Sequence, residues 1–339
     1  MTGFHGLADS ELRAGLERAL EAGGCELAGA VERRPYAYRT SFPLEELRVE
    51  LAGEGAVTLL FKQLDWEALE PEAQVAKPRF LHDPEREPAV YANLLRQAPP
   101  GPPRCFGAVT EPGRHWLFVE RVEGRELFQV GERELWEQAA RWLARFHVSM
   151  APDFDRHRQE GRLIAHDASF YRRWMQRAQE FARDSGQPPE PAQATERLAK
   201  THEQVVEALT AQARTVLHGE FYASNVLVAS ASDSFPSGVG KKPVKRVAPV
   251  DWELTAAGTG LSDLAALVTG WPAADRAAIA AAYAGEPGVP TFTLRDLDFA
   301  RLQVAIQWLG WAPPSWVPPE GQRHDWLAEA MRLAEELGL

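Results

Sequence analysis

The spacing of hydrophobic residues changes near residue 125, and the two parts on either side predict different structures. Before it, short segments rich in aromatic and aliphatic residues alternate with turn signals at Pro43 and at residues 53–55, which is the pattern of antiparallel strands. After it, apolar residues recur every three or four positions, beginning with Leu135 and Trp136, as in amphipathic helices. We therefore predict an α+β fold with a small antiparallel sheet followed by a mostly helical part.

The same patterns place the individual elements of the first part. A helix is expected over residues 8–22, with Asp9 or Ser10 as its N-cap, and a second over 87–97, which the prolines after residue 98 must end. Strands are expected over 36–42, 47–51, 57–64, 104–109 and 115–122.

The second part is predicted to be helical with one interruption. Helices are expected over 132–146, 168–185, 190–212, 261–270, 273–284, 295–310 and 323–337, and a β segment over 215–252. Within that segment, the Ser-, Gly- and Lys-rich stretch 230–246 is expected to be a mobile hairpin loop. The chain is accordingly divided into an N-terminal helix (1–25), a sheet-bearing region (26–124) and a helical region (125–339).

Composition and charge narrow the class of protein. Hydrophobic residues make up 45% and charged residues 25% of the 339 positions, which is ordinary for a soluble globular protein. The net charge of −11 opposes an extended nucleic-acid or anionic-membrane surface, since both require basic residues. No apolar stretch reaches the roughly 18 residues of a membrane span, and the first residues lack the pattern of a signal peptide.

Cysteine and histidine usage exclude two further classes. The two cysteines, Cys25 and Cys105, cannot form a multi-disulfide framework or a Cys-rich zinc site. The nine histidines are scattered without a zinc-hydrolase spacing. We expect a cytoplasmic monomer or homodimer whose partner is a small molecule, with no nucleic-acid or membrane partner.

Candidate chemistry is concentrated in two motifs. The first runs from His218 to Asn225 and includes Glu220, and the second begins at Asp251. A carboxylate, an amide five residues later and a second carboxylate beyond a hairpin can converge on one metal–phosphate site. Asparagine occurs only at Asn93 and Asn225, and one of the two falls where a neutral metal ligand would be needed. The alternative is a buried β-hairpin with a capping asparagine.

These motifs, HGExxxxN over 218–225 and DWE over 251–253, resemble those of the aminoglycoside phosphotransferase and choline kinase-like branch of the protein-kinase-like fold. The resemblance extends across both parts of the chain. It implies two lobes, with a nucleotide-binding lobe over 26–124 and a helical lobe with the acceptor site over 125–339. It also implies ATP, or GTP, as phosphate donor, Mg²⁺ as metal, and the hydroxyl group of a small molecule as acceptor.

The resemblance assigns a lysine and its partner. Lys62 ends the strand segment 57–62 and corresponds to the lysine that binds the α- and β-phosphates, and Glu87 corresponds to its helix partner. A lysine among phosphates must be held in place, and an ion pair does this. Pro88 puts Glu87 near the start of a helix, so Glu85 is the second choice of partner. The alternative for Lys62 is a solvated strand end.

Further nucleotide contacts follow from position alone. The segment 38–44 occupies the place of a phosphate-covering loop, where Thr40 or Ser41 could bind phosphate. An ordinary hairpin turn is the alternative there. The strand that ends near Glu120 resembles the hinge between lobes, where backbone groups from Glu120 to Val122 would meet the adenine edge.

The resemblance also implies a mechanism and raises one question. Asn225 and Asp251 would hold Mg²⁺, while Glu220 would accept or orient the proton of the attacking hydroxyl. The family usually has aspartate where this chain has Glu220, and one additional methylene moves a carboxylate by roughly 1 Å. The chain is therefore either an enzyme shaped around the longer side chain or a degenerate, pseudokinase-like nucleotide-binding module. The retention of Lys62 with both metal ligands favours the enzyme.

Supporting residues are also implied. His218 and Asp263 correspond to positions that brace the catalytic loop by hydrogen bonds, and Glu253 either contacts the site or solvates a strand end. In this fold the acceptor lies against the C-terminal helices, whose aromatic residues could stack on a sugar or cage a cation. The alternative for each of them is helix core. An aminoglycoside, amino sugar or amino alcohol are all compatible acceptors. The tryptophans concerned are Trp271, Trp308, Trp311, Trp316 and Trp326.

Overall fold

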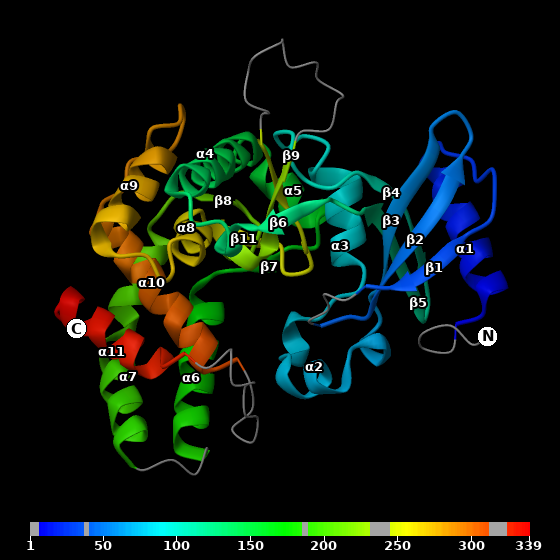
Figure 1. The fold of residues 1–339 in the computed structure, drawn as a ribbon. Helices are drawn as coiled ribbons and strands as arrows, with labels where there is room; N and C mark the ends of the chain where they lie inside the picture. The colour runs from blue at the N-terminus through cyan, green and yellow to red at the C-terminus, as the bar shows by residue number, and fades with distance from the viewer. Residues whose placement is uncertain (1–6, 37–40, 185–188, 231–244, 312–323) are drawn as a thin grey trace.

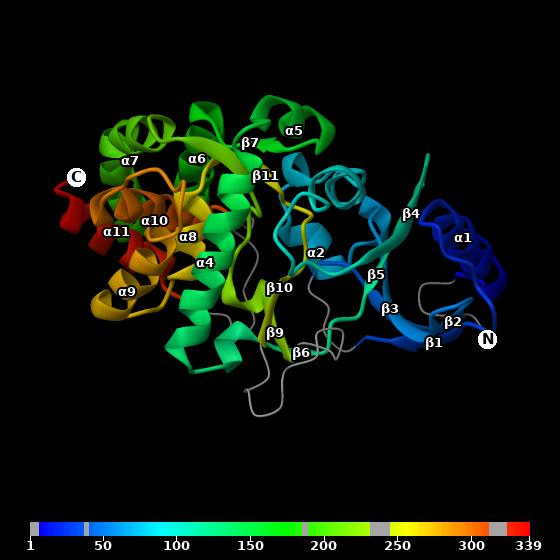
Figure 2. The ribbon, with the colours of Figure 1, turned by 90° about the horizontal axis from the view of Figure 1, so that it is seen from above.

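The computed structural model describes residues 7–36, 41–184, 189–230, 245–311 and 324–339. The N-terminal sheet and the C-terminal helices lie at opposite ends of the molecule (Figure 1). The view turned by 90° shows the same separation, with short strands between the two ends (Figure 2). The predicted α+β fold is thus confirmed.

The N-terminal sheet has five antiparallel strands in the order β1-β2-β3-β5-β4. Helix α1 (Asp9–Ala22) covers one face of it, and its Leu12, Leu16 and Leu20 are fully buried against the sheet. Each such leucine stabilises the fold by roughly 1.5–3 kcal/mol. The strands are β1 (Glu32–Pro35), β2 (Leu44–Leu51), β3 (Gly55–Gln63), β4 (Cys105–Glu111) and β5 (Arg114–Glu120).

Two details at the start of the chain differ from the sequence prediction. Helix α1 has Ala8 as its N-cap and no side-chain cap, so neither Asp9 nor Ser10 caps it, and both lie inside the first turn. The first strand is β1 rather than 36–42, of which residues 37–40 lie outside the described residues. The charged sequence of β1 hides its strand character, which depends on pairing with β2.

The segment between β3 and β4 leads from the sheet toward the helices. It contains helix α2 (Pro71–Ala76), which the sequence analysis did not predict, flanked by single 3₁₀ turns, and then α3 (Arg86–Ala89). Helix α3 continues as a π-helical turn over Val90–Leu94, which matches the helix predicted over 87–97. Its buried Val90 and Leu94 belong to the same apolar core as the C-terminal helices.

The helical part agrees closely with the predicted spacing. Helix α5, which is charged and lacks an apolar stripe, was missed for that reason. Helices α6 and α7 form an antiparallel pair packed against α10 and α11. The helices are α4 (Arg133–Met150), α5 (Phe154–Glu160), α6 (Ala168–Asp184), α7 (Pro189–Thr210), α8 (Leu261–Leu267), α9 (Ala273–Ala284), α10 (Leu294–Leu309) and α11 (Trp326–Leu337). No helix in the described ranges is long and apolar enough to cross a membrane.

Two small sheets replace the single β segment and position both motifs. Strands β8 (Arg214–Leu217) and β9 (Val226–Ser230) flank the first motif, while β10 (Lys245–Pro249) and β11 (Ala256–Thr259) flank the second. The sheet orders are β10-β9-β6 and β7-β11-β8, with β6 (Gly124–Glu126) and β7 (Ile164–Ala165) as edge strands. Residues 231–244 of the expected hairpin loop lie outside the described residues.

Candidate active site

Two of the residues expected to carry the chemistry, Glu220 and Asn225, lie on a loop, 218–225, that follows β8. Gly219 has a φ of +90°, and a Cβ there would lie 2.0 Å from the carbonyl oxygen of Leu254, so only glycine fits. The carboxylate of Asp263 accepts hydrogen bonds from the backbone N–H groups of His218 at 2.7 Å and of Gly219 at 2.9 Å. Asp263 therefore holds the start of the loop.

The ring of His218 joins this loop to the residue that precedes Asp251. Its Nε2–H donates to the carbonyl oxygen of Val250 at 3.0 Å, and its Nδ1 accepts from the N–H of Glu220 at 3.3 Å. The ring is buried, and burial lowers the pKa of His218. A neutral ring with one donor and one acceptor satisfies both partners, so His218 fixes the two motifs relative to each other.

Asn225 is positioned by hydrogen bonds within the loop. Its Nδ2 donates to the carbonyl oxygen of Glu220 at 3.0 Å, and its N–H donates to that of Tyr222 at 2.9 Å. Its own carbonyl oxygen accepts from the N–H of Val250 at 2.9 Å. Among the described residues its side-chain Oδ1 accepts no hydrogen bond, so this oxygen is available to a ligand.

Three charged side chains from separate elements meet where the second motif begins. Lys62, on β3, donates from Nζ to Glu87 Oε2 at 2.7 Å and to Asp251 Oδ1 at 2.6 Å. Glu87, on α3, also accepts through Oε1 from the backbone N–H that follows Asp251, at 3.2 Å. Asp251 has a φ of +64°, which aspartate tolerates better than most residues. The expected contact of Lys62 with Glu87 is present, and Glu85 pairs with an arginine instead.

Burial and mutual attraction set the charges of this trio. Burial would lower the pKa of Lys62, but the carboxylates of Asp251 and Glu87 raise it above its usual range. Burial would raise the pKa of Asp251, but the Lys62 ammonium holds it below its usual range. Burial raises the pKa of Glu87. The dominant pair at neutral pH is therefore a charged Lys62 with a charged Asp251.

Glu220 lies among like charges. Part of its side chain stays exposed to solvent, yet burial by the surrounding protein and the carboxylates of Glu253 and Asp251 raise the pKa of Glu220 to about 8. The ammonium groups of Lys77 and Lys62 act in the opposite direction. Glu220 therefore titrates close to neutral pH when no ligand is bound, and any added positive charge would favour its ionised form.

A second buried ion pair, not anticipated from the sequence, lies beside the first. Lys77, at the end of α2, donates from Nζ to Glu253 Oε2, and 3% of the lysine side chain is exposed. The ammonium groups of Lys62 and Lys77 lie 5.4 and 5.0 Å from the ring centre of Phe42. Arg86 donates to the carbonyl oxygen of Glu253 at 2.7 Å. Glu253 is thus a buried partner of Lys77 and not a solvated strand end.

Amino-acid usage contains a signal that could have found Lys77. Residues 1–199 include two lysines, Lys62 and Lys77, whereas arginine is frequent throughout. An ammonium is a compact point charge, and a guanidinium is a planar fork. Two lysines kept in an arginine-rich region therefore indicate sites that need the smaller cation, and both lysines reach the same cluster.

Six side chains make up what we call the charged cluster. In it, four carboxyl groups face two ammonium groups, and this crowding of carboxyl groups contributes to the raised pKa values of Glu87 and Glu220. No set of three or more His, Cys, Asp or Glu side chains in the described part of the chain could hold a metal alone. Mg²⁺ usually takes one or two protein oxygens and fills its shell with water and phosphate oxygens, so Asn225 Oδ1 and Asp251 fit it. The cluster consists of Lys62, Lys77, Glu87, Glu220, Asp251 and Glu253.

The expected phosphate-covering loop is only partly described. Residues 37–40, which include Thr40, lie outside the described residues. The carbonyl oxygen of Ser41 accepts from the N–H of Glu70 at 3.0 Å, which ties this residue to the start of α2. The phosphate contact of Ser41 stays a prediction.

The expected hinge is partly committed to other contacts. The N–H of Glu120 donates to the carbonyl oxygen of Arg104 at 2.7 Å, and the N–H of the next residue donates to the carbonyl oxygen of Thr58 at 3.1 Å. The Glu120 carboxylate pairs with Arg246 at 2.6 Å. A base edge would therefore have to meet the remaining backbone groups of this segment, such as the N–H of Val122, and the adenine contact stays a prediction.

Three of the five tryptophans expected near the acceptor come together. Trp308 lies between Trp311 and Trp326, with ring centres 5.7 and 5.6 Å away. Trp308 also lies 5.3 Å from Tyr222, which belongs to the loop 218–225. This aromatic group is therefore continuous with the loop that carries Glu220.

The other two tryptophans do not join this group in the described structure. Trp271 packs edge-on against Trp136 of α4 at 5.1 Å, so it serves the helical core. Trp316 lies outside the described residues. The expected aromatic wall is thus restricted to α10 and the residues around it.

A sequence model of the phosphotransferase enzyme family matches residues 72–302 of this chain. The matched range is more than half of the chain and includes Lys77, Glu87 and both motifs. Lys62 lies just outside it. No curated protein sequence matches the chain significantly.

Solved structures show the same fold. The macrolide 2'-phosphotransferase MphH from Brachybacterium faecium matches with a TM-score of 0.58 at 16% identity, over 96% of this chain and 97% of that one. The choline kinase LicA from Streptococcus pneumoniae matches with a TM-score of 0.57 at 12% identity, over 92% and 94%. A spectinomycin phosphotransferase solved with ADP and spectinomycin matches with a TM-score of 0.53 at 12% identity, over 92% and 90%.

Proposed function

The chain belongs to the phosphotransferase enzyme family, and from this premise we propose that it moves the γ-phosphate of ATP to a hydroxyl group of a small molecule. The region 26–124 would bind the nucleotide, and the region 125–339 would carry the loop 218–225 and the acceptor site. The spectinomycin phosphotransferase was solved with ADP, which supports an adenine nucleotide as the donor here, with GTP as the alternative.

One observation carries this proposal: the Lys62 ammonium donates hydrogen bonds to both Glu87 and Asp251. A solvated lysine at a strand end needs no carboxylate partner, whereas a lysine that meets phosphates must be held in one place. The partners come from a helix next to the sheet and from the second motif. This arrangement supports a role for Lys62 in binding the phosphates next to the Asp251 carboxylate.

The crowding of four carboxyl groups in the charged cluster supports a place for Mg²⁺, because an added cation would favour their ionised forms. Asn225 and Asp251 would hold it, and when bound it would neutralise charge on the β- and γ-phosphates. The chain's own contribution is then positioning: His218 and Asp263 hold the loop by its backbone. Phosphoryl transfer needs little else from a protein besides alignment and charge neutralisation.

Glu220 would accept or orient the proton of the attacking hydroxyl group. Its N–H donates to His218, and its carbonyl oxygen accepts from the N–H of Tyr222 at 2.7 Å and from the side chain of Asn225. Its backbone is thus fixed on both sides, so the additional methylene changes only how far the carboxylate reaches. The acceptor hydroxyl would accordingly lie about 1 Å farther from the loop than an aspartate would require.

The aromatic group around Trp308 supports an acceptor with a sugar-like or cationic face. Indole rings stack on sugars and attract ammonium groups, and Tyr222 joins this group to the loop. The overall charge of −11 also suits an amine. We propose an aminoglycoside, amino sugar or amino alcohol as the acceptor class.

The second candidate function is a nucleotide-binding module that transfers phosphate weakly or not at all. The observation that favours it is Glu220 in place of aspartate. The charged cluster argues against it, because buried charges are costly to keep and a degenerate module would not need a full set of them.

An ADP-release assay over a panel of hydroxylated amines tests the proposal. We expect acceptor-dependent ADP release and a product heavier by one phosphoryl group in mass spectrometry. Asp251→Ala should remove both signals, and Asp275→Ala, which changes a carboxylate on α9, should keep them. Tight ATP binding without acceptor-dependent ADP release across the panel would favour the binding module instead.

A further inference from the structure

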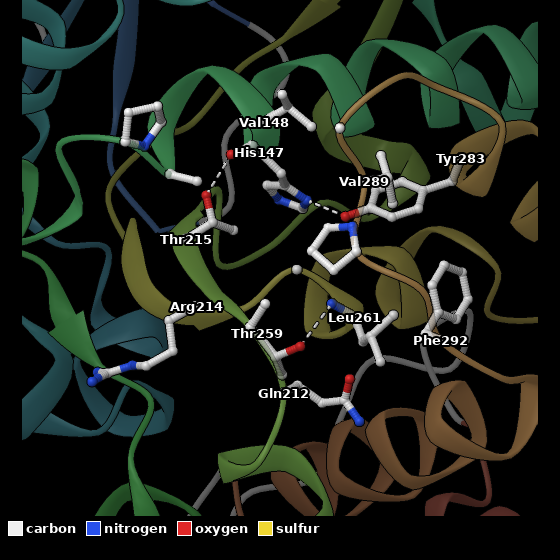
Figure 3. A pocket seen from close by; sticks show the side chains of 16 residues that line it. His147, Val148, Gln212, Arg214, Thr215, Thr259, Leu261, Tyr283, Val289 and Phe292 are labelled. Atoms are coloured by element: carbon white, nitrogen blue, oxygen red, sulfur yellow. Dashed lines mark hydrogen bonds between the residues drawn. The ribbon is translucent and has the colours of Figure 1, made fainter.

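A cavity separate from the charged cluster lies behind the loop 218–225. It has a volume of about 300 Å³ and is lined by the end of α4, the start of β8, the end of β11, helix α9 and the segment 288–292 (Figure 3). None of the residues that line it belongs to the charged cluster. It therefore calls for an explanation of its own.

The polar groups in the floor of the cavity are bonded to one another. The hydroxyl of Thr215 donates to the carbonyl oxygen of His147 at 2.7 Å, and the hydroxyl of Tyr283 donates to His147 Nδ1 at 2.7 Å. The Thr259 hydroxyl accepts from the N–H of Leu261 at 3.3 Å. Thr215, Tyr283 and His147 thus satisfy one another, so an occupant that packs on them gains little from polar atoms of its own, which would lose their hydration.

Apolar side chains make up most of the remaining wall. The side chains of Val289, Phe292 and Leu261 line the cavity (Figure 3). Arg214 is the one permanently charged residue among the described lining residues. The Arg214 guanidinium lies 5.0 Å from the ring of Phe154, outside the cavity, and points away from Phe292 (Figure 3). The interior is thus neutral and mostly apolar, with the half-buried amide of Gln212 as the one further polar side chain labelled in its wall (Figure 3). The rim, which includes Ala151 and Pro290, is exposed and leaves a way in.

The floor is connected to the loop by one hydrogen-bonded step. His147 Nε2 donates to Asp263 Oδ2 at 3.1 Å, and Asp263 holds the N–H groups of His218 and Gly219. Gly260 lets the floor approach this closely, since a Cβ there would lie 2.6 Å from both His147 Nδ1 and the Tyr283 hydroxyl. A molecule packed on the His147–Tyr283 pair would therefore restrict the motion of His147, which bonds the Asp263 carboxylate that holds the loop.

We propose that this cavity binds a small, neutral, apolar molecule of roughly bicyclic aromatic size, and that the occupant steadies the hold of His147 and Asp263 on the loop 218–225. The size follows from volume, since a dry cavity of about 150 Å³ takes a benzene ring and this one is about twice as large. The proposal goes beyond phosphate transfer and does not depend on it.

Indole is a suitable probe because it is neutral, bicyclic and soluble. Ligand-detected NMR and calorimetry on the full chain should show saturable binding at one site, with a Kd on the order of 1 mM or tighter. Binding should slow hydrogen exchange of the His218 and Gly219 amides by about fivefold or more. Absence of saturable binding, or binding with unchanged exchange at these amides, would overturn the proposal.

Filling the cavity provides the matched test. Val289→Trp should abolish indole binding, and Ala151→Phe on the rim should do the same if the first variant fails to fold. Val57→Trp, an equally half-buried valine on β3, should bind indole as the wild type does. Binding that survives both filling variants would place the indole elsewhere and refute the site.

Discussion

The charged cluster and the apolar cavity are both linked to the loop 218–225, but their polar groups are satisfied to different degrees. In the cluster, four carboxyl groups share two ammonium groups, and burial raises the pKa of both Glu87 and Glu220. In the floor of the cavity, Thr215, Tyr283 and His147 satisfy one another. The cluster is electrostatically incomplete without a ligand, whereas the floor of the cavity is complete without one.

This difference teaches where function and stability reside. Buried groups that lack a partner within the protein lower the free energy of unfolding, and they are kept where a ligand supplies the missing partner. Groups that are satisfied internally contribute to stability whether or not a ligand is present. Substitutions in the cluster should therefore change ligand binding and turnover, while substitutions of the cavity floor should change mainly the free energy of unfolding.

The largest effect is expected for Asp251→Asn. Losing the charge removes both the proposed metal ligand and a partner of Lys62, and several kcal/mol of transition-state stabilisation correspond to roughly 10⁴-fold in turnover. The measurement is steady-state turnover with an acceptor identified in the panel. Asp275→Asn, which changes a partly exposed carboxylate paired with Arg133, is the control and should keep its rate. A rate within tenfold of wild type in Asp251→Asn would break the comparison.

A somewhat smaller loss is expected for Glu220→Gln. Removing a positioned proton acceptor lowers turnover by about 10³-fold, within the usual range of 10²-fold to 10⁴-fold, while ATP affinity stays the same. Glu220→Asp should be impaired by roughly 10²-fold, because it withdraws the carboxylate by about 1 Å. Rapid-quench kinetics with ATP and the acceptor distinguish chemistry from binding. A gain of activity in Glu220→Asp would instead support the degenerate module.

Lys77→Met should cost stability more than it costs binding. The substitution leaves Glu253 buried without its partner, and breaking such a pair destabilises a protein by about 3 kcal/mol or more. Urea unfolding measures this loss, and the double variant Lys77→Met with Glu253→Gln should recover most of it. Lys200→Met, at an exposed lysine of α7, should be neutral. Equal stability of Lys77→Met and wild type would show that the pair is not a buried charge pair in solution.

The smallest effect is expected for Thr215→Val in the floor of the cavity. It removes one buried hydrogen bond to His147 at nearly constant shape, which costs about 1 kcal/mol of unfolding free energy. ATP affinity should not change. Thr58→Val, on an exposed face of β3, serves as the control in the same urea experiment. A larger effect on ATP affinity than on stability would contradict the division between the two regions.

Much of the fold could be predicted because the periodicity of hydrophobic residues and the composition of a segment are local signals. The spacing of Leu135, Trp136 and the residues after them is enough to predict α4, and most later helices follow the same rule. The first strand could not be predicted, because Glu32–Pro35 is charged and becomes a strand by pairing with β2, where Arg33 bonds Glu45 at 2.8 Å. Helix α2 is short and lacks buried residues, so it carries no periodic signal.

The residues of the candidate site also fall into those with a local sequence signal and those without one. Glu220, Asn225 and Asp251 could be proposed as site residues because their spacing is local to two motifs, and the contact of Lys62 with Glu87 was expected from the resemblance. The scarcity of lysine singles out Lys77, but its pairing with Glu253, 176 positions away, could not be predicted. Long-range pairing of charges is a tertiary property that no window of sequence contains.

The most direct test of the central claim is the effect of Mg²⁺ on ATP affinity. Calorimetric titration of ATP should show that Mg²⁺ lowers the Kd of the wild type by about tenfold or more, because the cation then offsets the repulsion between the phosphates and the carboxylates of the charged cluster. Asp251→Asn should bind ATP with the same Kd whether or not Mg²⁺ is present. An equal response to Mg²⁺ in the wild type and in Asp251→Asn would contradict the account.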